Sequence, residues 1–238
     1  MPADRAVGAD RAARAVGVLV LAVAVVVGGL YWLGTTHPPR SPGIATDRLG
    51  PDPDETVDDY RATSQRSLDT ASGTRWALIS LRAAETDEVA RTIAAGTTPA
   101  RVALHVPIAG VATPVAIVPV TPDAGSFTTA RTLAIDLLDG SAMNGTGFGG
   151  IVAQDGARGE AVSGVVGSRL AAGCACVVGV VVRGAVARLR AIAADRRVRA
   201  VEVLPADAAG ARFTVVPLLP EQTVGAAPLP DTGTVPAR

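Results

Sequence analysis

The 238-residue sequence contains no lysine, because all 22 of its basic side chains are arginine. This absence excludes a phosphate loop of the GxxxxGK[ST] kind and enzymes that form a Schiff base on a lysine. Two histidines and two cysteines are too few for most metal sites with a full set of protein ligands. We therefore predict no catalytic, cofactor-binding or metal-binding residues, and an enzyme is the less favoured interpretation.

Aromatic residues make up only 3 % of the chain, and the formal net charge is zero. Without an overall basic field, nucleic acid is not an expected partner. The densest basic stretch runs from Arg183 to Arg199. We interpret it as a solvated helix face, with contact to anionic lipid headgroups or wall polymer as the alternative.

One long apolar run stands out, Ala15–Leu33, which carries no charged residue. A helix of this length spans roughly 28 Å, which matches the hydrocarbon thickness of a bilayer. Tyr31 and Trp32 lie at its end, where interfacial aromatics are expected. The run predicts a transmembrane helix over residues 15–34, with the lipid bilayer as its partner. A cleaved signal peptide is the alternative, although Ala22–Ala24 places the small residues of a cleavage site inside the run.

Three arginines precede this run, and two arginines, Arg40 and Arg48, follow it closely. The positive-inside rule then predicts a single-pass protein of the cell membrane, with residues 1–14 in the cytoplasm and the remainder outside. Residues 35–53 are rich in turn-forming residues and predict a tether. We expect an extracytoplasmic domain over residues 54–220 and a disordered tail over residues 221–238.

The outer domain shows one order of elements twice. A helix is expected near Asp54–Leu68, with Asp52 and Asp54 as capping residues in preference to calcium ligands. The first set of strand, helix, strand and strand comprises Trp76–Arg82, Thr86–Ala95, Arg101–Val106 and Val115–Val118. The second comprises Cys176–Arg183, 186–193, Val198–Leu204 and Phe213–Val216. Helices near Ser126–Leu138 and Glu160–Ala171 connect the two sets.

The two sets also align by register. A shift of 98 residues places Arg101 on Arg199 and Pro119 on Pro217, among five identities between residues 101–122 and 199–220. Chance agreement in a biased composition is the alternative. Two β-α-β-β pseudo-repeats with their helices on one face predict an α+β fold, a ferredoxin-like sandwich.

Four segments together carry a resemblance to a known group. They are the N-terminal anchor, RLGPDPDETVDDY at Arg48–Tyr60, RWALISL at Arg75–Leu81 and GCACVVGVVVRG at Gly173–Gly184. The sequence resembles, over nearly its whole length, a family of uncharacterised actinobacterial single-pass membrane proteins. That family has no established activity, so the resemblance implies no catalytic residue.

Two motifs match known patterns without their usual context, and the two histidines match none. Gly145-x-Gly147-x-x-Gly150 has the spacing of a dinucleotide-binding loop but follows a predicted helix, so we interpret it as a loop. Leu229–Gly233 (LPDTG) matches a sortase site but lacks the apolar stretch that follows in sortase substrates. His105, within a predicted strand, and His37, in the tether, have no acid or nucleophile at a recognisable spacing.

Cys174 and Cys176 lie at the start of a predicted strand. We interpret them as buried small residues; a redox dithiol and an intermolecular bridge are the alternatives. The function that the sequence favours is a non-enzymatic interaction module of the cell envelope, which binds another envelope protein or a second copy of itself. The rival is an envelope redox protein using Cys174 and Cys176, or a lipid or polymer carrier with a groove between the repeats.

Overall fold

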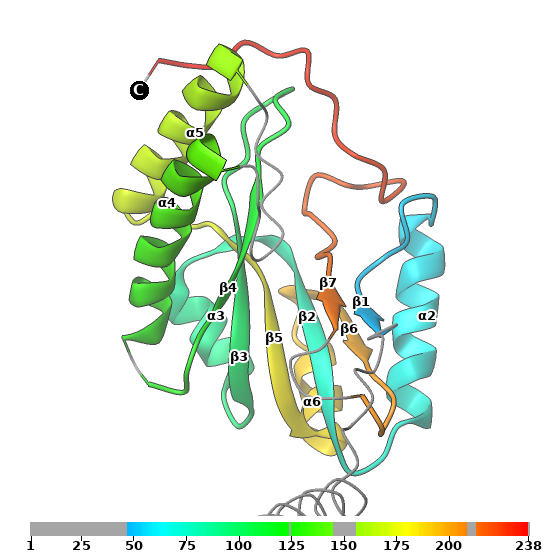
Figure 1. Ribbon diagram of the computed structural model, residues 1–238. Coiled ribbons are helices and arrows are strands. Elements are labelled where there is room, and N and C mark those ends of the chain that lie inside the picture. Colours follow the sequence, from blue (N-terminus) through cyan, green and yellow to red (C-terminus); the bar gives the residue numbers. More distant parts are fainter. Residues whose placement is uncertain (1–46, 124, 145–155, 209–212, 238) are drawn as a thin grey trace, which may run out of the picture. The chain divides into compact units, whose positions relative to one another are not determined.

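The computed structural model describes residues 47–123, 125–144, 156–208 and 213–237 (Figure 1). The predicted transmembrane helix over 15–34, His37 and the Gly145–Gly150 motif lie outside these ranges. Among the described helices, none has both the length and the apolar character needed to cross a membrane.

A five-stranded antiparallel sheet forms the centre of the domain. Its strands, in spatial order, are β4 (Val115–Pro119), β3 (Thr98–His105), β5 (Val177–Ala185), β2 (Thr74–Glu85) and β6 (Val198–Val203). Strand β5 separates β2 from β3, and β2 separates β5 from β6, so the two β-α-β units interleave. The predicted mixed α+β class is thereby confirmed.

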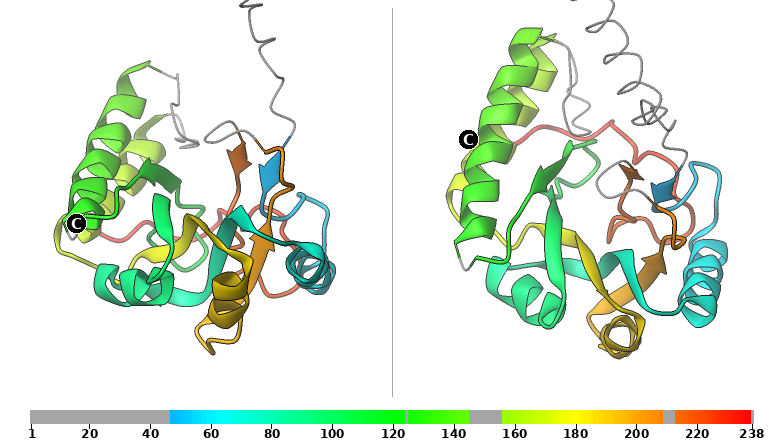
Figure 2. Two further views of the ribbon diagram at one scale, coloured as in Figure 1. Left: turned by 90° about the horizontal axis from the view of Figure 1, so that it is seen from below. Right: turned by 60° about the horizontal axis from the view of Figure 1, so that its bottom comes forward.

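Helices cover one face of this sheet, which we call the helix face. Helices α3 (Asp87–Ala94) and α6 (Val186–Ala193) lie on the same side (Figure 2), and α4 (Ser126–Asn144) and α5 (Gly156–Ala171) pack together beside β4. Helix α2 (Val57–Thr70) runs along β6 at the opposite edge. Alternate strand residues such as Ile79 and Val180 join all these helices in one large apolar cluster.

Local sequence explains where the helices begin and end. The Oγ atom of Thr86 accepts a hydrogen bond from the Val89 amide at the start of α3, and Gly96 follows its end with a φ of 78°. The helix expected over Thr86–Ala95 is thereby confirmed. The cap of α2 is Thr56, whose Oγ atom accepts from the Asp59 amide, so Asp52 and Asp54 are not the capping residues.

The second repeat departs from the prediction at its last strand. Strand β7 (Thr214–Val215) pairs in parallel with β1 (Arg48–Leu49) in a separate two-stranded sheet, whereas β4 extends the central sheet. Strand β1 lies within residues 35–53, which the composition predicted to be a tether. The pairing of β7 with a segment from the start of the domain could not be inferred from a repeat of local patterns.

Residues 213–237, which we call the C-terminal segment, cover the other face of the central sheet, the C-terminal face (Figure 2, right). The disordered tail expected over 221–238 differs from what is seen for residues 221–237. Gly225 forms a β-bridge with Thr56, and the Gln222 side chain accepts from the Leu219 amide and donates to the Ala226 carbonyl. These contacts are made to backbone amides and carbonyls, which nearly every residue type has, so composition gives no indication of them.

Candidate functional site

The two cysteines form a disulfide at the junction of α5 and β5. Helix α5 ends in a Schellman motif: the Gly173 amide donates to the Leu170 carbonyl and the Cys174 amide to the Arg169 carbonyl. Gly173, with a φ of 79°, supplies the left-handed residue that this motif requires. The turn therefore places Cys174 just after the helix, three residues before the strand.

The two sulfur atoms differ in exposure. Cys174 is half-buried and follows an exposed turn, whereas Cys176 is 1 % exposed and belongs to the large cluster of the helix face. The Cys176 carbonyl accepts a hydrogen bond from the His105 amide, which fixes this end of β5 to β3. A reagent from solvent would therefore meet Cys174 first.

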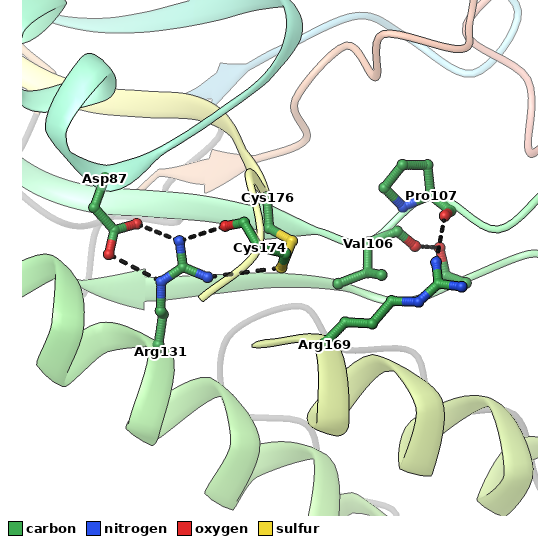
Figure 3. Close-up of a disulfide and its surroundings, with 8 residues drawn as sticks. Asp87, Val106, Pro107, Arg131, Arg169, Cys174 and Cys176 are labelled. Carbon is green, nitrogen blue, oxygen red and sulfur yellow. Dashed lines mark hydrogen bonds and ion pairs between the residues drawn. A yellow bond between two sulfur atoms is a disulfide. The ribbon is translucent and has the colours of Figure 1, made fainter. Parts of the chain in front are cut away.

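A buried arginine contacts the disulfide (Figure 3). Arg131 on α4 is 7 % exposed, and its Nη1 atom lies 3.7 Å from the Cys174 sulfur. Its Nη2 atom donates to the Cys174 carbonyl at 2.7 Å, and Nε and Nη2 donate to both carboxylate oxygens of Asp87. Asp87 is the first residue of α3, where a helix N-terminus favours a negative charge. One guanidinium thus connects α3, α4 and the disulfide.

The sequence interpretation of buried cysteines without a bridge is not what the structure shows, since Cys174 and Cys176 are bonded to each other. Arg131 and Asp87 went unnoticed in the sequence. The available signal was that Arg131 interrupts the apolar stripe of Phe127, Ala130 and Ala134 on its helix. A charge on such a stripe needs a buried partner, but the sequence does not say which one.

Arginines of the basic stretch from Arg183 to Arg199 bond to the ends of neighbouring helices. Arg188 donates to the Ala95 carbonyl after α3, and Arg190 donates to the carbonyls of Leu68, Asp69 and Ala71 at the end of α2. These guanidinium groups satisfy carbonyls that a helix end leaves without partners. On the helix expected to be a solvated face, both arginines thus bond to backbone carbonyls of neighbouring elements.

The repeat register places Arg101 on Arg199, and the two side chains behave alike. Arg101 donates to the Phe213 carbonyl at 3.2 Å, and Arg199 donates to the Leu219 carbonyl at 2.9 Å. Burial lowers the pKa of both guanidinium groups. Both arginines therefore hold the C-terminal segment against the sheet.

A second polar cluster lies under β1, on the C-terminal face. The Gly50 amide and the Tyr60 hydroxyl both donate to Oε2 of Glu202 on β6, at 2.5 and 3.1 Å. Burial raises the pKa of Glu202 to about 7, although these two hydrogen bonds oppose the shift. The cluster joins β1, α2 and β6 through one carboxyl group.

His105 and Glu221 are brought together from positions far apart in the sequence. The His105 ring is 1 % exposed, and its Nε2 atom lies 3.7 Å from Oε1 of Glu221. Sequence reasoning found no acid for His105, because Glu221 comes from the C-terminal segment. In the ranges that the structure describes, no group of three or more His, Cys, Asp or Glu residues could hold a metal ion.

Comparisons with protein-family models, with curated proteins and with solved structures found no match to this chain.

Proposed function

We propose that this protein is a membrane-anchored thiol–disulfide module of the cell envelope, which exchanges electrons with a partner protein through Cys174 and Cys176. The observation that carries the proposal is the contact between the buried guanidinium of Arg131 and the Cys174 sulfur. Ala15–Leu33 would hold the module at the membrane, with the domain outside the cytoplasm. The interleaved β-α-β units support a ferredoxin-like scaffold, to which β4, α4 and α5 are additions.

A purely structural disulfide is the competing interpretation. In the chain-entropy treatment, a bridge that closes only three residues restricts the unfolded chain by about 1.6 kcal/mol, compared with about 3 kcal/mol for a loop of 15 residues. Cys174 is also already positioned by the Schellman motif. The bridge therefore adds little to the stability of this junction, which favours a chemical role.

The chemistry proceeds in two balanced exchange steps. A thiolate of a partner dithiol attacks the half-buried Cys174 sulfur, the Cys174–Cys176 bond breaks, and Cys176 leaves as a thiolate that takes up a proton. The second thiolate of the partner then attacks the partner's sulfur atom in the mixed disulfide. A disulfide forms within the partner, and Cys174 leaves as a thiolate that takes up a proton. The partner has lost two electrons, and the module holds two thiols.

Arg131 stabilises the second leaving group. A thiolate at Cys174 would form beside the guanidinium, and a neighbouring positive charge lowers the pKa of a cysteine thiol. Asp87 shares that charge and holds the guanidinium in place. In the reverse direction the same contact would make Cys174 the attacking thiolate.

The full-length protein in detergent micelles tests the proposal. It is equilibrated with glutathione redox buffers, and the fraction of reduced cysteine pair is measured by mass spectrometry after alkylation. We expect a reduction potential above about −230 mV, as in disulfide exchange proteins. A value below about −300 mV is typical of structural disulfides and would overturn the proposal.

Matched variants test the roles of single residues. Cys176→Ser leaves Cys174 free, and we expect it to form a mixed disulfide with glutathione at least about tenfold faster than Cys174→Ser, because Cys176 is buried. Arg131→Gln should raise the pKa of the Cys174 thiol in the Cys176→Ser background. Arg169→Gln is the control, because Arg169 donates to the Pro107 carbonyl instead (Figure 3). Equal pKa values for the Cys174 thiol in the two variants would contradict the role of Arg131 in stabilising the thiolate.

A further inference from the structure

A cavity of about 330 Å³ lies at the end of β3, beside the C-terminal segment. Its walls are apolar and come from the loop after β3 and from the C-terminal segment, including Ile108, Val111, Leu229 and Pro230. Two polar side chains reach it, His105 and Glu221. A mostly apolar cavity with a few convergent polar groups is the usual form of a small-molecule site.

The hydrogen-bond network determines which ring nitrogen of His105 carries the proton. The Thr113 hydroxyl donates to the Val106 carbonyl at 2.7 Å, so its oxygen is left to accept from Nδ1 of His105, 3.4 Å away. Burial lowers the pKa of His105, and the negative charge of Glu221 opposes this shift. Burial thus favours the neutral ring, and the Thr113 oxygen favours the tautomer with its proton on Nδ1, which leaves a lone pair on Nε2.

The Nε2 atom is buried and makes no hydrogen bond within the part of the chain that the structure describes. The nearest polar partner is Oε1 of Glu221 at 3.7 Å, and a carboxylate is also an acceptor. Two acceptors thus face the same space without a donor between them. A buried acceptor without a donor is costly, so this arrangement favours a ligand that brings N–H groups, and the carboxylate favours a positive charge.

The LPDTG motif lines part of this cavity through Leu229 and Pro230, and we call Leu229–Gly233 the strap. The Asp231 carboxylate accepts two hydrogen bonds from Arg158 on α5 and one from the Ala112 amide. The Gly233 amide donates to the Gly110 carbonyl at 2.6 Å. A Cβ atom on Gly233 would lie 2.5 Å from the Ala109 carbonyl oxygen, so only glycine fits here. The motif therefore has a structural role that its resemblance to a sortase site does not suggest.

We propose that this cavity binds a small primary amine with an apolar chain, whose ammonium group donates to Nε2 of His105 and to the Glu221 carboxylate, and whose chain lies under Leu229 and Pro230. Neither cysteine lines this cavity, so the site is distinct from the thiol–disulfide chemistry, although the His105 amide donates to the Cys176 carbonyl. Its occupant would be fixed by charge at one end and by apolar contact along its length.

The test uses the full-length protein in lipid nanodiscs, labelled with ¹⁵N-histidine. The chain has only two histidines, so a His37→Gln background leaves one ring to observe, that of His105. Hexylamine is titrated as the probe, and hexanoate, of the same chain length and opposite charge, serves as its control. We expect the Nε2 resonance to move and saturate with hexylamine and to stay in place with hexanoate. An Nε2 resonance that moves with neither probe, or equally with both, would overturn the proposal.

Two variants separate specific binding from partition into lipid. Glu221→Gln keeps the size of the side chain and should raise the half-saturating hexylamine concentration at least about tenfold. Glu88→Gln, on the exposed side of α3, should leave it unchanged. Ala109→Trp, which fills the mouth of the cavity from an exposed loop position, should abolish the response without changing the fold. An unchanged response in Glu221→Gln and Ala109→Trp would contradict the site.

Discussion

The two faces of the central sheet are built differently. On the helix face, residues of every strand and of α2 to α6 join one continuous apolar cluster. On the C-terminal face, apolar residues form three small clusters around Leu78, Tyr60 and Val178. Between those clusters lie Ser80, His105 and Glu202.

This difference follows from what covers each face. Helices satisfy their own backbone groups and can present a purely apolar stripe to the sheet. The C-terminal segment has little regular structure, so its carbonyls and amides need partners, which Arg101, Arg199 and Gln222 supply. The helix face therefore carries most of the stability, while the polar groups with unusual surroundings gather on the other face.

The largest effect on the free energy of unfolding is expected from truncating a side chain in the continuous apolar cluster of the helix face. Leu189→Ala on α6 should lower the free energy of unfolding by about 4 kcal/mol, because the helices around it leave no room for collapse. Leu219→Ala on the C-terminal face should cost about 2 kcal/mol, because the C-terminal segment, to which Leu219 belongs, can settle into the space. Denaturant unfolding of the full-length protein measures both. Equal losses would remove the contrast between the faces.

Removing the charge of Arg131, which is buried on the helix face, should have a slightly smaller effect. Arg131→Met leaves the Asp87 carboxylate and the Cys174 carbonyl without their donor, and we expect a loss of about 3 kcal/mol. Arg158→Met breaks the exposed pair with Asp231 and should change global stability little. Both variants are compared by urea unfolding with the disulfide intact. An unaffected Arg131→Met protein would mean that the pair is not needed for folding.

The C-terminal face should make stability depend on pH. Because the pKa of Glu202 in the folded state, about 7, is above its ordinary value of 4.5, the folded protein binds more protons between these values. The free energy of unfolding should then fall as pH rises from about 4.5 to about 7, by up to about 3 kcal/mol. Glu202→Gln, which keeps an acceptor for Gly50 and Tyr60, should flatten this slope. If the free energy of unfolding of Glu202→Gln still fell over this pH range, another titrating group would be responsible for the dependence.

The smallest effect is expected at the strap. Gly233→Ala would force the strap away from the Ala109 carbonyl, with a global loss below about 1 kcal/mol, because few buried groups depend on it. Hydrogen exchange at the Ala112 amide, which donates to Asp231, should nevertheless become much faster. Protection that is retained at Ala112 would show that the strap stays in place.

Patterns of local origin predicted most of the fold. Short apolar segments located β2, β3 and β5, and the helix expected over Thr86–Ala95 is α3. What failed depended on contacts between distant residues. The C-terminal segment is rich in proline, glycine and threonine, a composition typical of disorder, yet it is held by Asp231 to Arg158 and by its backbone to α2 and the loop after β3.

The candidate sites show the same limit. The Cys174-x-Cys176 spacing drew attention to the disulfide, but its buried neighbour Arg131 became meaningful only once α4 lay beside the end of α5. Glu221 meets His105 only because the C-terminal segment returns across the sheet. A single sequence contains no signal that pairs such residues.

The small β1–β7 sheet gives the domain a mechanical property. The proposed anchor would pull on the chain at Asp47, whose carbonyl accepts from the Thr214 amide, and the Leu49 carbonyl accepts from the Val216 amide. Tension on the tether would therefore load these two hydrogen bonds and the contact of Gly50 with Glu202 before any strand of the central sheet. Because so few hydrogen bonds hold β1, this pairing would break at a lower force than the helix-covered core, which would stay folded.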